Sequence, residues 1–116
     1  MATVTSTEPS APRRDSQVLE LVTFRVLVHA SQQEVLAAAA KMMGWLRQQA
    51  GFVSRDLAVT ADGEWVDAVR WRSLADALAA AENINSAADA VDFLQLIDGD
   101  TVVMRHAAVV LDSAAN

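Results

Sequence analysis

Apolar positions along this chain follow two periodicities, one typical of helices and one typical of strands. Val35, Ala39 and Met42 recur at helical spacing, which predicts a helix with one side against a core. Runs dominated by β-branched and aromatic residues predict strands instead. Four such runs are present, at residues 18–28, 52–60, 64–72 and 101–111.

Capping signals set the expected bounds of the helices between these strands. Ser31 begins a run with the spacing of a capping box, so the first helix is expected to start there and to end at Gly51. Ser73 is expected to cap a second helix, which residues 83–86 interrupt. Ser86 is then expected to cap a further helix before the last strand.

Turn signals complete the order of the elements. Residues 61–63 include Gly63 where a tight turn needs a positive φ, so the second and third strands are predicted to form a hairpin. Residues 98–100 predict another turn. The order β-α-β-β-α-β predicts a ferredoxin-like α+β fold, a four-stranded antiparallel sheet with helices on one face. We assign residues 17–112 to this domain and the Ser-, Thr-, Pro- and Ala-rich residues 1–16 to a disordered tail.

Both faces of the predicted sheet carry apolar side chains. In the first strand, Val22 and Phe24 share one face, whereas Leu19 and Leu21 share the other. The helices can cover only one face, and large exposed apolar patches are rare on monomers. A homodimer through the open sheet face is therefore expected, which would make a dimeric α+β barrel. The alternative is that a terminal segment covers this face, but residues 1–16 are too polar to do so well.

Composition excludes several classes of protein. The chain has no cysteine, which removes disulfides, thiolate catalysis and cysteine-ligated metals. Its net charge of −6 argues against nucleic acid as a partner. No apolar run approaches the roughly 20 residues that cross a bilayer, and no signal-peptide pattern is seen, so no membrane partner and a cytoplasmic location are expected. His29 and His106 have no metal-ligand spacing, and no phosphate-binding loop occurs, so neither a metal nor a cofactor is expected.

Three stretches of sequence carry a family resemblance. They are LVTFRV in the first strand, WLRQQAGFVSRDLA from the first helix into the second strand, and GEWVDAVRWRSLADALAA from the third strand into the second helix. The last stretch places Trp71 directly before a capped helix. In this order and spacing, residues 20–106 resemble the antibiotic-biosynthesis-monooxygenase-like group of dimeric α+β barrel proteins, in which such a tryptophan recurs.

The resemblance implies a homodimer with a pocket between the sheet and its helices. Known members include cofactor-free oxygenases of polycyclic aromatic or quinol-like substrates, and haem-degrading oxygenases. The haem-degrading members use an asparagine on the first strand, a histidine on a helix and a tryptophan, of which this chain keeps only Trp71. Some quinol-oxidising members use a tyrosine, which is absent here. Haem degradation is therefore disfavoured, and the resemblance implies fold and dimer more than catalysis.

Aromatic side chains give the predicted pocket its character. Trp65, Asp67 and Trp71 share one face of the third strand by parity. The expected pocket-lining residues are Trp71, Trp65, Phe24 and Met104. Such walls suit a flat aromatic or small hydrophobic ligand, and the alternative is that these residues are simply core.

His106 is the best acid–base candidate, because histidine titrates near neutral pH. Asp67 or Asp56 is expected to orient it through one ring nitrogen, so His106 and Asp67 are the candidate catalytic residues. The alternative is a half-buried histidine satisfied by the backbone.

Arginines at strand positions are the remaining charged candidates. They are Arg25, Arg55, Arg70 and Arg105. If they face the dimer interior, they need carboxylate partners such as Glu20 or Glu64, because an unpaired buried charge is costly. They would then form a structural ion-pair network or, alternatively, a site for an anionic substrate. His29, at the end of the first strand, is expected to be exposed.

Two hypotheses of function remain open. The first is a cofactor-independent monooxygenase that deprotonates a small aromatic or quinol-type substrate, with His106 as base and Trp71 shaping the pocket. The second is a non-catalytic homodimeric module that binds a small ligand or a protein partner.

Overall fold

Four strands form one antiparallel sheet in the computed structural model of this chain, which describes residues 16–113. They are β1 (Val18–Val26), β2 (Phe52–Val59), β3 (Trp65–Trp71) and β4 (Ile97–Ala108). Their order is β2-β3-β1-β4, so the first strand lies between the third and the fourth. The predicted ferredoxin-like α+β fold is confirmed. Apart from Ser16, the predicted tail lies outside the described residues.

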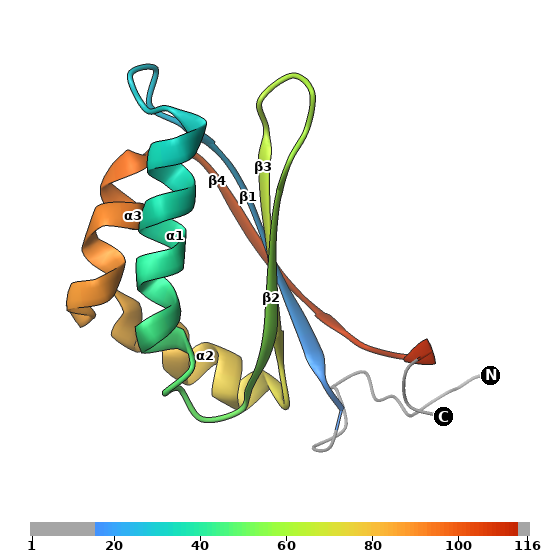
Figure 1. Ribbon diagram of the computed structural model, residues 1–116. Helices are drawn as coiled ribbons and strands as arrows, with labels where there is room; N and C mark the ends of the chain where they lie inside the picture. Colours follow the sequence, from blue (N-terminus) through green and yellow to red (C-terminus); the bar gives the residue numbers. More distant parts are fainter. Residues whose placement is uncertain (1–15, 114–116) are drawn as a thin grey trace.

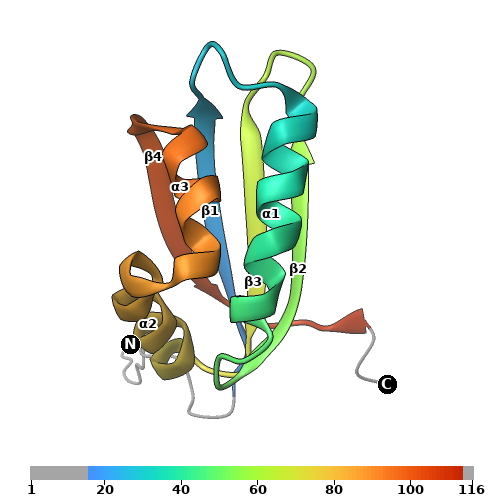
Figure 2. The same cartoon turned by 60° about the vertical axis from the view of Figure 1, so that its left-hand side comes forward.

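The helices all lie on one face of this sheet (Figure 1). They are α1 (Gln32–Leu46), α2 (Leu74–Asn83) and α3 (Val91–Leu96), with the 3₁₀ turns η2 (Ile84–Ser86) and η3 (Ala88–Ala90) between the last two. Figure 2 shows α1 over β2 and β3, α3 over β1 and β4, and α2 across one end of the sheet. Within residues 16–113, no helix is both long and apolar enough to cross a membrane.

The start of α1 follows the predicted capping box. The Ser31 hydroxyl accepts from the backbone N–H of Glu34 at 3.1 Å, and the Glu34 carboxylate accepts from the Ser31 N–H at 2.9 Å. The predicted end at Gly51 is wrong, because α1 ends at Leu46. Gly51 has a φ of 81° and instead makes the turn into β2. Ser73 caps α2 as predicted.

Two further helix and strand boundaries differ from the predictions. The first strand ends at Val26 rather than at Val28, whose side chain is fully exposed in the following turn. Ser86 does not cap a helix, because its hydroxyl donates to the carbonyl of Asn83 and η3 begins only after Ala87.

The predicted turn at residues 98–100 is also wrong, because β4 already begins at Ile97 and runs to Ala108. The turn chemistry is present, since the Asp100 N–H donates to the Asp98 carboxylate at 3.2 Å. It produces an irregularity in the pairing of β4 with β1 instead of ending the strand.

The core lies between the sheet and the helices. Phe24 on β1 and Trp71 on β3 are each 1% exposed. The Phe24 ring stacks on Trp65 at 6.4 Å and meets Phe93 of α3 edge-on at 5.8 Å. The central strands are therefore fixed to α3 by aromatic contacts.

The opposite face of the sheet has no helix over it (Figure 1). The register places Leu21 opposite Ala68, and Thr23 opposite both Val66 and Val103, on this face. Val103 is 54% exposed. Arg105 lies opposite Leu21 on the same face. The uncovered face of the described chain therefore carries Leu21, Ala68, Val66 and Val103 around one exposed arginine, and it is apolar apart from that charge at its centre.

Candidate functional site

A cavity of about 290 Å³ lies between the helix-covered side of the sheet and the helices. Most of the side chains around it are apolar or aromatic, and they come from three of the strands, all three α-helices and η2. The lining residues are Glu20, Val22, Phe24, Met42, Trp45, Leu46, Asp67, Val69, Trp71, Ala80, Ala81, Ile84, Phe93, Leu94, Ile97, Gly99, Val102 and Met104. Such a composition suits a small aromatic or hydrophobic ligand.

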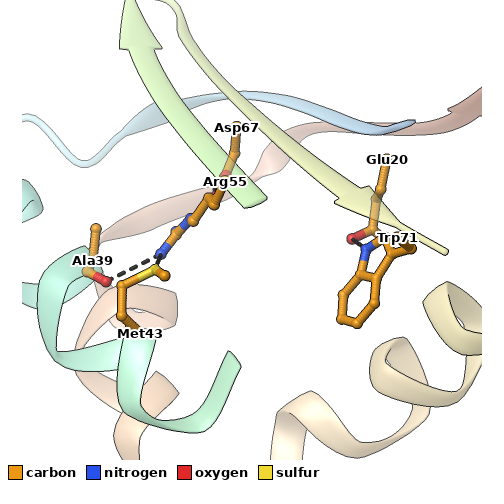
Figure 3. Close-up of polar contacts among 6 residues, drawn as sticks. All are labelled: Glu20, Ala39, Met43, Arg55, Asp67 and Trp71. Carbon is orange, nitrogen blue, oxygen red and sulfur yellow. Dashed lines mark hydrogen bonds and ion pairs between the residues drawn. The ribbon is translucent and has the colours of Figure 1, made fainter. Parts of the chain in front are cut away.

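Two carboxylates, Glu20 and Asp67, are the charged groups of the lining, and no Lys, Arg or His is among the described residues that line the cavity. Their environments differ. Figure 3 shows Asp67 beside Arg55, and Glu20 beside the indole of Trp71.

Glu20 lies on the central strand, on the side that faces the helices. The Nε1–H of Trp71 donates to its Oε1 at 3.3 Å, and the Nε2 atom of His106 lies 3.0 Å from its Oε2. The strand register brings these side chains together. His106 lies opposite Glu20 on β4, and Trp71 lies opposite Val18, which is two residues before Glu20 on the same side of β1. Glu20 can accept a proton or hydrogen bonds inside the cavity.

His106 lies beside this carboxylate but does not line the cavity. Its side chain is 21% exposed, whereas that of Glu20 is 11% exposed. The predicted orienting partners, Asp67 and Asp56, are wrong: the register puts His106 opposite Glu20, and Asp67 is taken by Arg55. Asp56 pairs with Ala68, on the face away from the helices.

Asp67 forms a closed ion pair with Arg55. The guanidinium donates to the two carboxylate oxygens at 2.9 and 2.7 Å and to the carbonyl of Ala39 in α1 at 3.0 Å. It also lies 5.0 Å from the centre of the Phe93 ring. The two charged side chains are only 4% and 9% exposed. The sequence left open that Arg55 faces a dimer interior with a partner such as Glu20 or Glu64; it faces α1 instead, because β2 pairs it with the helix-facing Val69.

The other strand arginines also lack the predicted partners. Arg25 pairs with the exposed Asp62 in the turn between β2 and β3 at 3.2 Å, and Arg70 donates to Gln17 at 3.1 Å. Arg105 lies opposite Leu21 on the open face of the sheet. The hydroxyl of Thr60 and then the charge of Arg25 lower the pKa of Asp62. His29 is exposed, as expected.

Three of the four predicted lining residues surround the cavity. Trp71 and Phe24 line it from the core, and Met104 lines it while remaining 48% exposed, so it lies near the opening. Trp65 does not line it and packs against Phe24 instead. Within residues 16–113, no cluster of three or more His, Cys, Asp or Glu side chains could hold a metal.

The sequence analysis missed Glu20 and Trp45 as lining residues. Parity in the first strand could have found Glu20, because it shares a face with Val22 and Phe24. Trp45 could have been found from its place beside Leu46 on the buried side of α1.

No family model and no curated protein matches this chain. Several solved structures resemble it. SnoaB, a cofactor-independent oxygenase from Streptomyces nogalater, is 18% identical over 84% of this chain and 95% of its own, with a TM-score of 0.61. A Bordetella bronchiseptica protein, provisionally named an antibiotic biosynthesis monooxygenase, is 15% identical over 83% and 99%, with a TM-score of 0.63. The haem-degrading protein Rv3592 from Mycobacterium tuberculosis is 20% identical over 84% and 94%, with a TM-score of 0.56.

These likenesses are at the level of fold. They confirm that the chain folds like antibiotic-biosynthesis-monooxygenase-like proteins, as the sequence resemblance implied. One fold carries different chemistries, here a cofactor-independent oxygenase and a haem-degrading protein. The function of this chain must therefore be argued from its own cavity.

Proposed function

We propose that the protein is a cofactor-independent oxygenase that binds a small hydroxylated aromatic compound in this cavity and removes a proton from it. One observation carries the proposal: an aromatic cavity contains a carboxylate, Glu20, whose oxygens are held by Trp71 and His106. A positioned carboxylate that faces a mostly apolar cavity is suited to general base catalysis.

In this proposal Glu20, rather than His106, is the base that touches the substrate. His106 holds the carboxylate from the more exposed side, and Trp71 positions it from within the core. Proton transfer to Glu20 leaves an electron-rich substrate anion, which dioxygen oxidises. For a substrate with a reactive CH₂ group, one oxygen atom becomes a carbonyl and the other leaves as water with the two hydrogens.

The test is oxygen uptake with a polycyclic probe, 1,8-dihydroxyanthrone, above its rate of spontaneous oxidation. The change Glu20→Gln keeps the side-chain volume and removes the base, so we expect uptake to fall by about 100-fold or more. Glu64→Gln is the matched control, because Glu64 is an exposed carboxylate outside the cavity lining. Equal uptake by the wild type and Glu20→Gln would contradict the role of Glu20.

A second candidate function is a non-catalytic module that binds a small hydrophobic ligand. It is favoured by the packing of Trp71 and Phe24, which are almost completely buried in the core. Saturable binding of the same probe without oxygen uptake by the wild type would favour this module over the oxygenase.

We also propose that a second copy of the chain covers the open sheet face. Support comes from the apolar side chains of this face, because Leu21, Ala68 and Val103 lie around Arg105 on a side of the sheet that no helix covers (Figure 1). We expect a dimer at micromolar concentration by light scattering, and a monomer after Leu21→Arg. Val28→Arg is the control, because Val28 is fully exposed in a turn. A wild-type monomer would refute the dimer.

A further inference from the structure

We infer that the cavity selects its ligand by charge, and that Glu20 is the residue that does so. An aromatic ligand with a neutral or cationic hydrogen-bond donor is accepted, and an aromatic carboxylate is rejected. The inference rests on the proposal that this cavity is the ligand site, but it does not require that the ligand is oxidised.

The charge balance of the cavity lining is the first reason to expect that an anionic ligand is rejected. Asp67 is neutralised, because Arg55 donates to both of its oxygens. Glu20 has only His106 as an ionisable partner, and His106 lies outside the cavity lining. With no cationic side chain among the described lining residues, a ligand anion meets repulsion there.

The hydrogen-bonding capacity of the cavity lining is the second reason to expect a preference for a ligand with a donor group. A carboxylate can accept about four hydrogen bonds, and Glu20 receives one from Trp71 and one contact from His106. Glu20 therefore has free capacity for a ligand N–H or O–H. The indole N–H of Trp71 is already engaged, so a ligand carboxylate would find a poor supply of donors at this end of the cavity.

Three probes with the same two-ring body separate these cases: 2-naphthylmethylamine, 2-naphthol and 2-naphthoate. Binding is measured at pH 7.5 by calorimetry and by quenching of the fluorescence of Trp45 and Trp71, which line the cavity. We expect the amine and the naphthol to bind at least about tenfold more tightly than the naphthoate.

Variants assign the selectivity to one residue. Glu20→Gln is expected to bring the affinities for the amine and the naphthoate to within about threefold. Glu64→Gln removes a carboxylate outside the cavity and is expected to keep the wild-type ratio. His106→Gln removes the one partner that could neutralise Glu20, so the ratio is expected to persist or increase.

Equal affinity of the wild type for the amine and the naphthoate would overturn the inference. So would an unchanged ratio in folded Glu20→Gln, or no binding of any probe to the folded wild type. Charge-selective binding without oxygen uptake from 1,8-dihydroxyanthrone would refute the oxygenase and support the inference. Oxygen uptake together with equal probe affinities would overturn the inference alone.

Discussion

Asp67 and Glu20, two carboxylates on neighbouring strands, both face the helices, but they have different partners (Figure 3). Asp67 on β3 is closed off by Arg55, which also donates to the backbone of α1. Glu20 on β1 accepts a long 3.3 Å hydrogen bond from Trp71, and its other oxygen lies 3.0 Å from Nε2 of the half-buried His106. Both carboxylates line the cavity, but Asp67 has a guanidinium as its partner, whereas Glu20 has no arginine or lysine partner.

The partners of each carboxylate indicate whether it supports the fold or is available to a ligand. A bidentate arginine–carboxylate pair satisfies the geometry of both partners, so it holds β2, β3 and α1 together and has little to offer a ligand. A carboxylate with an indole and an imidazole as partners is held less tightly. Under the proposed function, the region around Glu20 is the reactive part of the layer, and the region around Arg55 is its support.

Asp67→Asn is the strongest test of the difference between Asp67 and Glu20. This change leaves the guanidinium of Arg55, whose side chain is 4% exposed, without its anion. Removing one partner of a buried pair is strongly destabilising, so we expect the free energy of unfolding to fall by about 3–5 kcal/mol. Urea denaturation measures it.

The double change Arg55→Leu with Asp67→Leu is the control for this prediction. Replacing both partners by apolar residues removes the unpaired charge, so most of the lost stability should return. If Asp67→Asn costs less than about 1 kcal/mol, the pair is not the support that the comparison requires.

The sequence predicted which side chains face the helices but not which of those side chains contact one another. Strand parity correctly placed Trp71 and Phe24 on the helix side, because side-chain alternation is a local property. The partner of His106 depends on which strands are neighbours and in what register, which is a long-range property. The prediction of Asp67 or Asp56 as the partner assumed a cross-strand register, whereas β1 lies between β3 and β4 in the sheet.

Turn chemistry was misread for a similar reason. Asp98 and Asp100 form the hydrogen bond that a turn would contain, but pairing with β1 resumes on both sides of it. The segment is therefore an irregularity inside a strand, and it brings Gly99 to the cavity lining. A local signal identified the bend and could not tell that the strand continues.

A smaller effect is expected from Ser31→Ala at the start of α1, the helix that receives the Arg55 hydrogen bond. Loss of this N-cap is expected to cost about 1 kcal/mol. The backbone N–H of Ser31, and then its hydroxyl, lower the pKa of Glu34. The charged form of Glu34 therefore stabilises the fold above its unfolded pKa, and this contribution is lost as the pH falls through the lowered folded value.

In Ser31→Ala, an NMR titration should show the pKa of Glu34 moving only part of the way back towards its ordinary value, because residue 31 keeps the backbone N–H that is the larger cause. Hydrogen exchange should rise in the first turn of α1, and affinity for 2-naphthol should not change, because this end of the helix is outside the cavity lining. A loss of naphthol affinity would show that the support and the reactive region are not separable.

The smallest change in stability is expected from Glu20→Gln, which is the same carboxylate-to-amide change as Asp67→Asn. The amide oxygen can still accept from Trp71, and the amide N–H₂ can donate to the ring nitrogen of His106, whose side chain is 21% exposed, so no fully buried charge loses its partner. We expect the free energy of unfolding to change by less than about 1 kcal/mol, as is usual when a hydrogen bond is altered and not orphaned. Urea denaturation of both variants under one set of conditions measures the contrast directly. If Glu20→Gln is as costly as Asp67→Asn, Glu20 is itself part of the structural support, and its role as the free acceptor in the cavity fails.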